Sequence, residues 1–359
     1  MHVLKKVLKT VLIILTVLVV AVGGYVAYVF IAYHRLGDSD ITPKSGAADI
    51  AKVGAEYKIV TYNIGFGAYE DDYGFFMDGG TQSRAWSKER LDANLKNINN
   101  LLVNQKADLY FLQEVDFNST RTYGVDERDY FTFEKMSSVF AQNYDSPYLF
   151  YPILKPHGAS KSGIMTFSDF AINSAKRVEL PVETGFMKLL DLDRCYSKSR
   201  VATEDGKELV LYNFHLSAYT SDGTIAADQL EIILKDIDGE YAKGNYCIAG
   251  GDFNKDLLGD SSKYFGISGE NYTWAKPIPA QTFEKHNASL VAAVDKDNPV
   301  PTCRNADGPY NDKQYVITID GFLITPNVSL VNTEVIDTRF KYSDHNPVKM
   351  TFKLADNKN

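Results

Sequence analysis

Cysteine is scarce in this sequence, and no internal repeat is present. The three cysteines, Cys195, Cys247 and Cys303, are too few for a disulfide framework and lack the spacing of a cysteine-ligated metal site. The sequence allows one disulfide bond, between Cys195 and Cys303. Cys247 stands in an apolar run and is expected to be buried. The absence of a repeat period and of low-complexity tracts argues against a repeat architecture.

A basic excess is also missing. The 359 residues include 38 Lys and Arg against 46 Asp and Glu, a formal net charge of -8. Residues 1–35 hold four of the basic groups and no acid, so the remaining 34 basic and 46 acidic groups give the rest of the chain a charge of -12. This balance disfavours a general nucleic-acid binder, because such proteins neutralise phosphates with basic surfaces. Residues 155–200 have a local excess of three positive charges, which fits either a basic groove or an ordinary solvated face.

One long apolar run is present, from Val11 to Tyr33. At ~1.5 Å per residue, a helix of this length spans the ~30 Å hydrocarbon core of a bilayer. A cleaved signal peptide is the alternative, because lysines precede the run, but the apolar part of a signal peptide has only ~7 to 15 residues. The length therefore favours a retained transmembrane helix at residues 11–33.

The charges around this run predict its orientation. Lysines at positions 5, 6 and 9 precede it, so residues 1–10 are expected to be a short cytoplasmic segment, with the rest of the chain outside the cytoplasm at the cell membrane. Residues 34–56 show no sustained apolar period and are expected to form a linker. One large folded domain is then expected at residues 57–359.

Helical and strand-like patterns alternate within that domain, which favours an α/β architecture. Apolar residues recur at helical spacing in two segments, 91–102 and 230–237. A hairpin turn is expected at Asp205-Gly206. Strands are expected at residues 57–64, 109–112, 208–216, 246–249, 316–324 and 348–352.

Polar residues suited to acid–base or metal chemistry follow or end these predicted strands. Strand ends hold short side chains on a stiff scaffold, and in layered α/β proteins they meet at one rim where ligand sites lie. The two most distinctive motifs are Gly251-Asp252-Phe253-Asn254 and Ser343-Asp344-His345-Asn346-Pro347. Each motif alone is an ordinary turn, and their joint occurrence is what indicates a site. The candidates are Asn63, Glu114, His215, Asp252, Asn254, Asp320, Asp344 and His345.

Convergence of the acids in this set would repel a phosphate substrate unless a divalent cation were bound. Ligands that are all oxygen select a hard ion, Mg²⁺ first and Mn²⁺ or Ca²⁺ as alternatives, rather than zinc. Such an ion binds a phosphoryl oxygen and offsets charge on the leaving oxygen. The sequence therefore predicts a metal-assisted phosphoester-hydrolysing site.

The remaining candidates suit the other steps of that chemistry. His345 can polarise the phosphoryl group, and Asp320 can hold it as an imidazolium. Asp252 is suited to orient or deprotonate the attacking water. Asn63 and Asn254 can donate amide hydrogens to phosphate oxygens.

With these residues in view, the chain resembles the endonuclease/exonuclease/phosphatase superfamily over about residues 57–354. The resemblance implies a four-layer α/β sandwich, in which two packed β-sheets are flanked by helices. It implies that Glu114 is the principal metal ligand, with Asn63 and Asp344 close to the ion. It also implies catalytic roles for His215, Asp252, Asn254, Asp320 and His345.

Two positions bear on the branch of the superfamily. His215 matches an additional histidine of the deoxyribonuclease and sphingomyelinase branches, although a histidine inside an apolar strand is often structural. Residues 160–164 fall where relatives place a tyrosine or a basic phosphate contact, and Lys161 is assigned that role. The inositol phosphatases have lysine after the Asp-His pair, where Asn346 stands here, and this disfavours that branch.

The expected function is a membrane-tethered, Mg²⁺-dependent phosphodiesterase, in the first place an endonuclease-like enzyme. The alternative is a sphingomyelinase-like phospholipid phosphodiesterase or a phosphomonoesterase, because tethering brings the site close to lipid. Tyr73, Phe75 and Phe76 would then form an apolar lip, although core packing is the ordinary use of such aromatics. A non-catalytic binding domain on the same fold is the alternative of another class. The expected partners are the membrane and a phosphodiester, either nucleic acid or a phospholipid head group.

Overall fold

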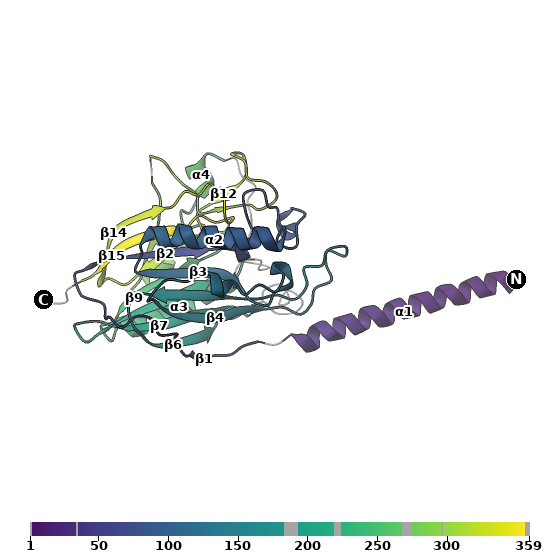
Figure 1. The fold of residues 1–359 in the computed structure, drawn as a ribbon, viewed down its shortest axis with the longest axis horizontal. Helices are drawn as coiled ribbons and strands as arrows, with labels where there is room; N and C mark the ends of the chain where they lie inside the picture. The colour runs from purple at the N-terminus through teal and green to yellow at the C-terminus, as the bar shows by residue number, and fades with distance from the viewer. Residues whose placement is uncertain are drawn as a thin grey trace.

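Two β-sheets pack face to face in the computed structural model, which describes residues 2–33, 35–182, 193–218, 224–267, 275–295 and 297–355 (Figure 1). The seven-stranded sheet has the order β1 (Ser39–Ile41), β6 (Ile172–Glu179), β7 (Cys195–Ala202), β8 (Glu208–His215), β9 (Tyr246–Asp252), β13 (Asp320–Ile324) and β10 (Ser289–Ala292). The six-stranded sheet has the order β14 (Val328–Val335), β15 (Val348–Leu354), β2 (Glu56–Asn63), β3 (Leu109–Asp116), β5 (Lys161–Ser168) and β4 (Ser137–Asp145).

The inner faces of the two sheets form one apolar core. Ile59 and Phe111 of the six-stranded sheet and Leu211, Ile248 and Phe322 of the seven-stranded sheet belong to it, and all five are fully buried. Because side chains alternate along a strand, the opposite face of each sheet is also apolar here and needs its own cover. Helices provide that cover on both sides.

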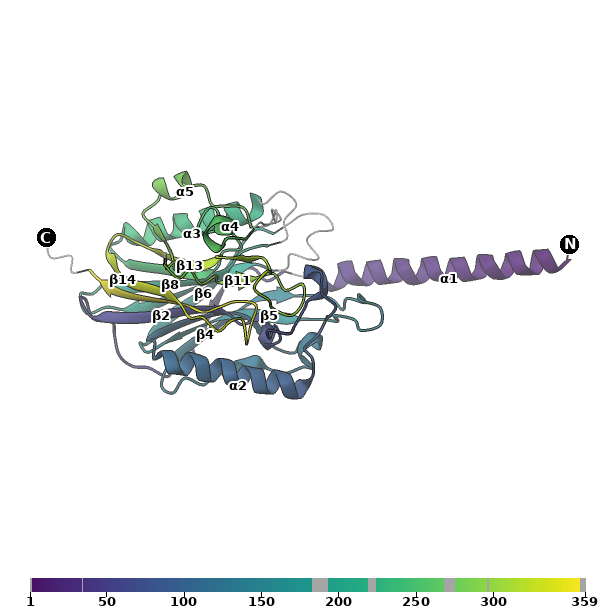
Figure 2. The same cartoon turned by 90° about the horizontal axis from the view of Figure 1, so that it is seen from above.

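The helix α2 (Lys88–Gln105) covers the six-stranded sheet, and α3 (Thr224–Tyr241) covers the seven-stranded sheet (Figure 2). Ser87 caps α2 by accepting a hydrogen bond from the Arg90 amide at 3.2 Å. Each helix buries residues three and four apart, which is the spacing of one helical face. These residues are Leu91, Leu95, Ile98 and Leu102 in α2, and Leu230, Ile233, Leu234 and Ile237 in α3.

The layers therefore run helix, sheet, sheet, helix, which confirms the expected four-layer α/β sandwich. The expected strand at 316–324 is wrong as one element. It divides into β12 (Val316–Ile317), which pairs with β11 (Cys303–Arg304) in a separate small sheet, and β13. The short helices α4 (Ser261–Phe265) and α5 (Gln281–Glu284) both lie in the connection between β9 and β10.

The segment expected to be a linker, residues 34–56, does not stand free of the body. Its β1 pairs antiparallel with β6, and Lys44 and Ala51 form isolated bridges with Ser138 and Thr203. These backbone hydrogen bonds explain why a segment without an apolar period is ordered, since the period reports burial of side chains and not pairing at a sheet edge. The N-terminal segment is thus fastened to β6 at the edge of the seven-stranded sheet and, through Lys44, to β4 at the edge of the six-stranded sheet.

The helix α1 (His2–Ala32) projects away from the body (Figure 1). It is the one helix among the described residues that is long and apolar enough to cross a membrane, and none of its most apolar window is buried. The three cysteines are buried and free, so the structure shows no bridge between Cys195 and Cys303.

A buried ion cluster ties α3 to β7. Glu240 is 2 % exposed and accepts hydrogen bonds from Arg200 at 2.6 Å, Lys198 at 2.8 Å and Asn245 at 2.8 Å. Burial alone would raise the pKa of this carboxyl, but the hydrogen bonds from Arg200 and Lys198 hold the pKa far below its ordinary value.

We expect Glu240→Gln to lower the free energy of unfolding by about 3 kcal/mol, because two cations lose their buried partner. A depressed carboxyl pKa contributes stability above the unfolded pKa of ~4.3, and this contribution is lost as the pH falls below it. Urea unfolding at several pH values measures both effects. An acid-dependent decline between pH 5 and pH 3 that is equally steep in the variant and the parent would contradict the assignment.

Candidate active site

Strand register brings together three of the predicted residues on the seven-stranded sheet. His215 ends β8 and lies opposite Asp252, which ends the parallel strand β9. Asp252 in turn lies opposite Asp320, the first residue of the antiparallel strand β13. Neighbouring strands are ~4.8 Å apart, so this register alone places the two acids and the histidine side by side.

The end of β9 can take this form only because it contains glycine. Gly251 has φ 145°, and a β-carbon at this position would lie 1.9 Å from the carbonyl oxygen of Phe214. A side chain would therefore force β9 away from β8 and displace Asp252. The glycine of the Gly251-Asp252-Phe253-Asn254 motif is a requirement of close strand packing beside the site.

The six-stranded sheet supplies Asn63 and Glu114 from the ends of the parallel strands β2 and β3. Glu114 has φ 56° and sits where the register of β3 against β5 shifts, so the bulge turns its side chain out of the regular alternation. The Asn63 amide nitrogen donates to Glu114 Oε1 at 3.0 Å and to Asp252 Oδ2 at 3.1 Å. Asn63 thereby links the two sheets at the site.

The Ser343–Pro347 loop delivers the other acid and histidine. Ser343 Oγ donates to the backbone carbonyl of Asn63 at 2.9 Å, and the Arg304 amide donates to the carbonyl of Asp344 at 2.9 Å. The Asn346 amide donates to the Thr302 carbonyl at 2.7 Å. The loop is therefore held by the six-stranded sheet and by the segment around β11, on either side of His345.

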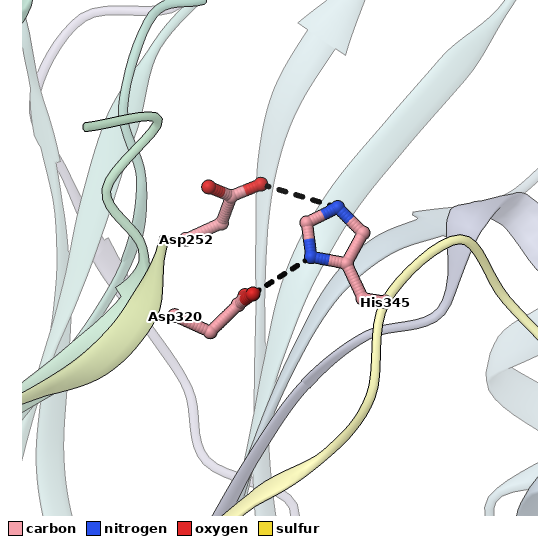
Figure 3. Close-up of side chains that lie close together, drawn as sticks. All are labelled: Asp252, Asp320 and His345. Carbon is pink, nitrogen blue, oxygen red and sulfur yellow. Dashed lines mark hydrogen bonds and ion pairs between the residues drawn. The ribbon is translucent and has the colours of Figure 1, made fainter. Parts of the chain in front are cut away.

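His345 lies between two carboxylates (Figure 3). Its Nδ1 is 2.8 Å from Asp320 Oδ2, and its Nε2 is 3.7 Å from Asp252 Oδ2. The hydrogen bond to Asp320 fixes the ring orientation and leaves Nε2 facing Asp252. His215 approaches the same carboxylate oxygen, with its Nε2 3.5 Å from Asp252 Oδ2.

The two histidines have opposite electrostatic environments. Burial opposes the charge of His345, but the negative charge and hydrogen bond of Asp320 raise its pKa well above the ordinary value. Burial lowers the pKa of His215 well below its ordinary value, and the positive charge of Arg194 acts in the same direction. The site thus favours the charged form of His345 and the neutral form of His215.

The acids of the site are crowded. Burial raises the pKa of Asp252 to about 7, and the negative charge of Asp320 adds to the effect. Burial raises the pKa of Asp344 to about 7, with a further contribution from the charge of Glu114. One buried oxygen of Asp320, Oδ1, has no hydrogen-bond partner among the described residues. Acids in this state fit a divalent cation, which would favour their ionised forms.

Two groups of potential ligands could hold such a cation. Glu114 and Asp344 line the same cavity and repel each other through their charges. Asp252, Asp320 and His345 form a second group, whose potential ligand atoms lie within 4.8 Å of one another. In the second group Nδ1 of His345 is already engaged by Asp320, so the carboxylates of the first group are the better match for a hard ion.

Most of the predicted residues line one cavity of about 470 Å³. Asn63 and Asp320 stand behind this lining and touch it through their hydrogen bonds to Asp252 and His345. Lys161 is not among the lining residues, and its ammonium group lies 3.3 Å from Asp145, so its role as a phosphate contact stays a prediction. The predicted residues in the lining are Glu114, His215, Asp252, Asn254, Asp344 and His345.

Asn254 has hydrogen bonds within the site that the sequence did not predict. It adopts φ 49°, its backbone amide donates to Asp252 Oδ1 at 2.8 Å, and its side-chain amide donates to the Leu216 carbonyl at 2.8 Å. Asn254 therefore orients Asp252 in this structure, while its contact with phosphate stays a prediction.

The cavity contains polar residues that the sequence patterns did not identify. Arg121 is held by a two-pronged contact with Asp116, at 2.8 Å for each hydrogen bond, and Arg194 and Tyr144 also line the cavity. Tyr144 comes near the end of β4, whose residues alternate between buried and half-buried, so the same strand-end argument could have found it. Nothing in the sequence around Arg121 and Arg194 distinguishes them from surface arginines.

Residues 60–345 match the profile of the Endonuclease/Exonuclease/phosphatase family. The chain belongs to this family. Its members are hydrolases that act on phosphoester bonds, and they typically depend on a divalent metal. The match confirms the resemblance inferred from the two motifs. No curated protein sequence matches the chain.

Solved structures of low sequence identity share the fold. An endonuclease/exonuclease/phosphatase from Beutenbergia cavernae has 15% identity and a TM-score of 0.56, over 84% of this chain and 72% of that chain. One from Bacteroides vulgatus has 15% identity and a TM-score of 0.51, over 84% and 99%. ANGEL2, a 2',3'-cyclic phosphatase, has 14% identity and a TM-score of 0.56, over 90% and 99%. At these identities the likeness concerns the fold.

The requirement for glycine beside Asp252 is testable. We expect Gly251→Ala to lower the free energy of unfolding by at least ~3 kcal/mol, because the added methyl group meets backbone and the φ value is unfavourable for alanine. Gly239→Ala in α3 is the matched control, since a β-carbon there meets nothing within 4 Å. It should be neutral or stabilising by up to ~1 kcal/mol. Equal unfolding midpoints for the two variants in urea would refute the steric argument.

Proposed function

We propose that this protein is a membrane-tethered, divalent-metal-dependent phosphodiesterase that uses direct attack by water. The observation that supports this most strongly is the position of His345 between Asp320 and Asp252, beside a cavity that Glu114 and Asp344 also line. A binding domain has no need for an oriented imidazolium next to a carboxylate that titrates near neutrality.

Asp252 is the residue that accepts the proton from the attacking water. A general base works best when its pKa lies near the working pH, and burial raises the pKa of Asp252 to about 7. The Asn63 amide and the Asn254 backbone amide hold its two oxygens in place. An ordered carboxylate of this kind fixes the direction from which water approaches phosphorus.

His345 provides positive charge for the phosphoryl oxygens. As an imidazolium it stabilises the charge that develops on these oxygens, and Asp320 keeps it protonated and correctly oriented. His215, which is neutral, can donate one hydrogen bond to the phosphate or to the water. Arg194 lines the same cavity and offers a further positive charge to an anionic substrate.

Glu114 and Asp344 are the residues proposed to hold the cation, Mg²⁺ in the first place. When bound, a divalent ion neutralises phosphate charge and stabilises the leaving oxygen, an effect worth several kcal/mol. Asn63 orients Glu114 through its amide nitrogen. Its carboxamide oxygen accepts from the Gly65 amide at 3.0 Å, so ligation by Asn63 itself would use the second lone pair of that oxygen.

The tether in this proposal is α1, with its lysine-rich end in the cytoplasm and the catalytic domain outside. Contacts between the C-terminal part of α1 and the body support retention of the helix. The Tyr28 hydroxyl accepts from the Tyr148 amide at 3.0 Å, and the Tyr25 hydroxyl donates to the Tyr148 carbonyl at 3.2 Å. A cleaved signal peptide would have no reason to dock on the mature domain.

Nucleic acid is the first substrate expected from the sequence, but the basic residues that suggested it are mostly paired within the fold. Within the stretch 155–200, Lys161 pairs with Asp145, Lys198 with Asp236 and Glu240, and Arg200 with Glu208 and Glu240. The Arg177 guanidinium is buried and donates to backbone carbonyls. Residues 183–192 of this stretch lie outside the described residues. The described basic side chains mainly stabilise the fold.

Hydrolysis of bis-p-nitrophenyl phosphate with Mg²⁺ tests the catalytic assignment. We expect Asp252→Ala and His345→Ala each to lower kcat/KM by at least ~100-fold, because each removes a group used in proton transfer or charge stabilisation. His286→Ala is the control, since this histidine contacts Asp238 and Glu231 on α3 and does not line the cavity. Near-normal turnover by both site variants would exclude the proposal.

The metal assignment has its own test. We expect a chelator to abolish turnover and added Mg²⁺ to restore it. We expect Glu114→Gln to raise the Mg²⁺ concentration that gives half-maximal rate by at least ~10-fold, because a neutral amide is a weaker ligand than a carboxylate. Isothermal titration with Mg²⁺ gives a readout that does not depend on turnover. An unchanged Mg²⁺ dependence in the variant would place the ion elsewhere.

A further inference from the structure

The loop from Tyr148 to His157 presents large apolar side chains to solvent. Ile153 is 83% exposed and Leu154 is 99% exposed, next to Phe150 and Tyr151, which are also exposed. Scattered apolar residues are normal on protein surfaces, but consecutive ones at the tip of one loop form a patch that is costly in water. The patch therefore calls for an apolar partner.

The loop is held in this exposed position by its base. The Leu149 and Gly158 backbones exchange hydrogen bonds at 3.1 Å, and Arg84 donates to the Pro156 carbonyl at 2.6 Å. Ser83 Oγ donates to the Lys155 carbonyl at 2.5 Å. These bonds hold the tip away from the body, so Ile153 and Leu154 cannot fold back into the core.

The same loop contacts the C-terminal part of α1. Tyr28 and Tyr25 form the hydrogen bonds to Tyr148 described above, the Phe150 amide donates to the Tyr25 hydroxyl at 3.3 Å, and the Tyr25 and Phe150 rings are 5.3 Å apart edge to face. In both ribbon views the loop, drawn in teal, projects from the end of the body at which α1 leaves it (Figures 1 and 2).

The length of α1 indicates where this contact lies relative to a bilayer. Lys9 is the last charged residue before the apolar run, and Tyr28 follows it by 19 positions, or ~28 Å of helix. This matches the ~30 Å of a hydrocarbon core, and tyrosine is typical of the interface at its edge. A loop bonded to Tyr25 and Tyr28 therefore lies at the outer surface of the membrane that α1 spans.

The catalytic cavity reaches this same contact. Its lining contains the acids and histidines of the site and also large apolar side chains, among which Tyr151 contacts Phe76 and Phe150 contacts Tyr25 of α1. A cavity that combines anion-binding groups with apolar side chains in contact with α1 suits a molecule with a phosphate head group and acyl chains.

We propose that the Tyr148–His157 loop is a second membrane contact, which inserts Ile153 and Leu154 into the bilayer beside α1 and sets the mouth of the cavity on the lipid surface. The partner is the lipid bilayer, and the substrate drawn from it is a lipid-borne phosphodiester. The choice of substrate rests on the proposed phosphodiesterase function. The membrane contact of the loop rests on exposure, on the contacts with α1 and on the length of that helix.

Fluorescence in nanodiscs tests the membrane contact. The full chain carrying Leu154→Trp is reconstituted into phosphatidylcholine discs with or without bromine in the acyl chains, and the signal of the parent chain is subtracted. We expect a blue-shifted emission and at least ~2-fold quenching by the brominated lipid, since bromine quenches only indole that enters the acyl region. Leu330→Trp, at a position that is 45% exposed on β14 of the body, is the matched control and should show neither effect.

Equal quenching of the two reporters, or of neither, overturns the membrane contact. Quenching of neither reporter is also the result expected if the loop binds another protein, because such a loop would stay in water in the discs. Insertion of Ile153 and Leu154 is the one arrangement that quenches only the loop reporter.

Turnover separates the substrate from the contact. Discs of phosphatidylcholine, phosphatidylethanolamine, phosphatidylglycerol and sphingomyelin in equal parts are incubated with the full chain, and the water-soluble phosphorylated products are measured. We expect hydrolysis that Asp252→Ala abolishes. The double variant Ile153→Asp/Leu154→Asp should lower it at least ~10-fold while it leaves bis-p-nitrophenyl phosphate turnover unchanged, because neither residue lines the cavity.

The possible failures differ from one another. Turnover of the soluble diester without turnover of any lipid overturns the lipid substrate and leaves the phosphodiesterase intact. Absence of both activities overturns the proposed function itself. Equal lipid turnover by the double variant and the parent overturns the role of the loop.

Discussion

The site depends on a contact between two sheets that carry its parts separately. Asn63 provides this contact, because one amide nitrogen reaches Glu114 on its own sheet and Asp252 on the other. Deeper between the sheets, Gln113 donates to Asn213 at 2.8 Å, and Asn213 donates to the Met165 carbonyl at 2.8 Å. Buried polar groups are costly unless paired, so these bonds permit few relative positions of the two sheets. A slip of one sheet would break the bonds and separate Asp252, the proposed general base, from Glu114, a proposed cation ligand.

The acids and histidines could be found from the sequence because strand ends converge in layered folds. Asp252 and His215 each close an apolar strand, and parallel pairing of β8 and β9 sets them opposite each other. Helical spacing identified the buried face of α2 for the same reason, since periodicity reports burial. Hydrophobic periodicity could not predict features that depend on backbone pairing. The edge strand β1 has no apolar period, and the break between β12 and β13 follows from the start of β13 opposite Asp252.

Side-chain chemistry was less predictable than position. Lys161 pairs with Asp145, and Asn254 holds Asp252 and the Leu216 carbonyl, which the sequence did not predict. Their contacts with phosphate stay predictions. In both cases a neighbour in space, distant in sequence, offers a partner that pattern reasoning cannot see. The same limit applies to the cavity. Its apolar lining residues come from α1, from the loop before β5 and from the segment before α2, and only the folded chain shows that they meet.

The polar and the apolar residues of the cavity differ in how they interact with water. Acids with pKa values near 7 and an imidazolium are effective where water is scarce, because the low dielectric strengthens their interactions. In a freely soluble enzyme an apolar cavity mouth of this kind would invite aggregation. In the proposed arrangement next to a bilayer, lipid covers the same residues, excludes water from the entrance and leaves the attacking water to the polar residues. In that arrangement tethering and chemistry are coupled, because the membrane proposed to hold α1 also completes the walls of the site.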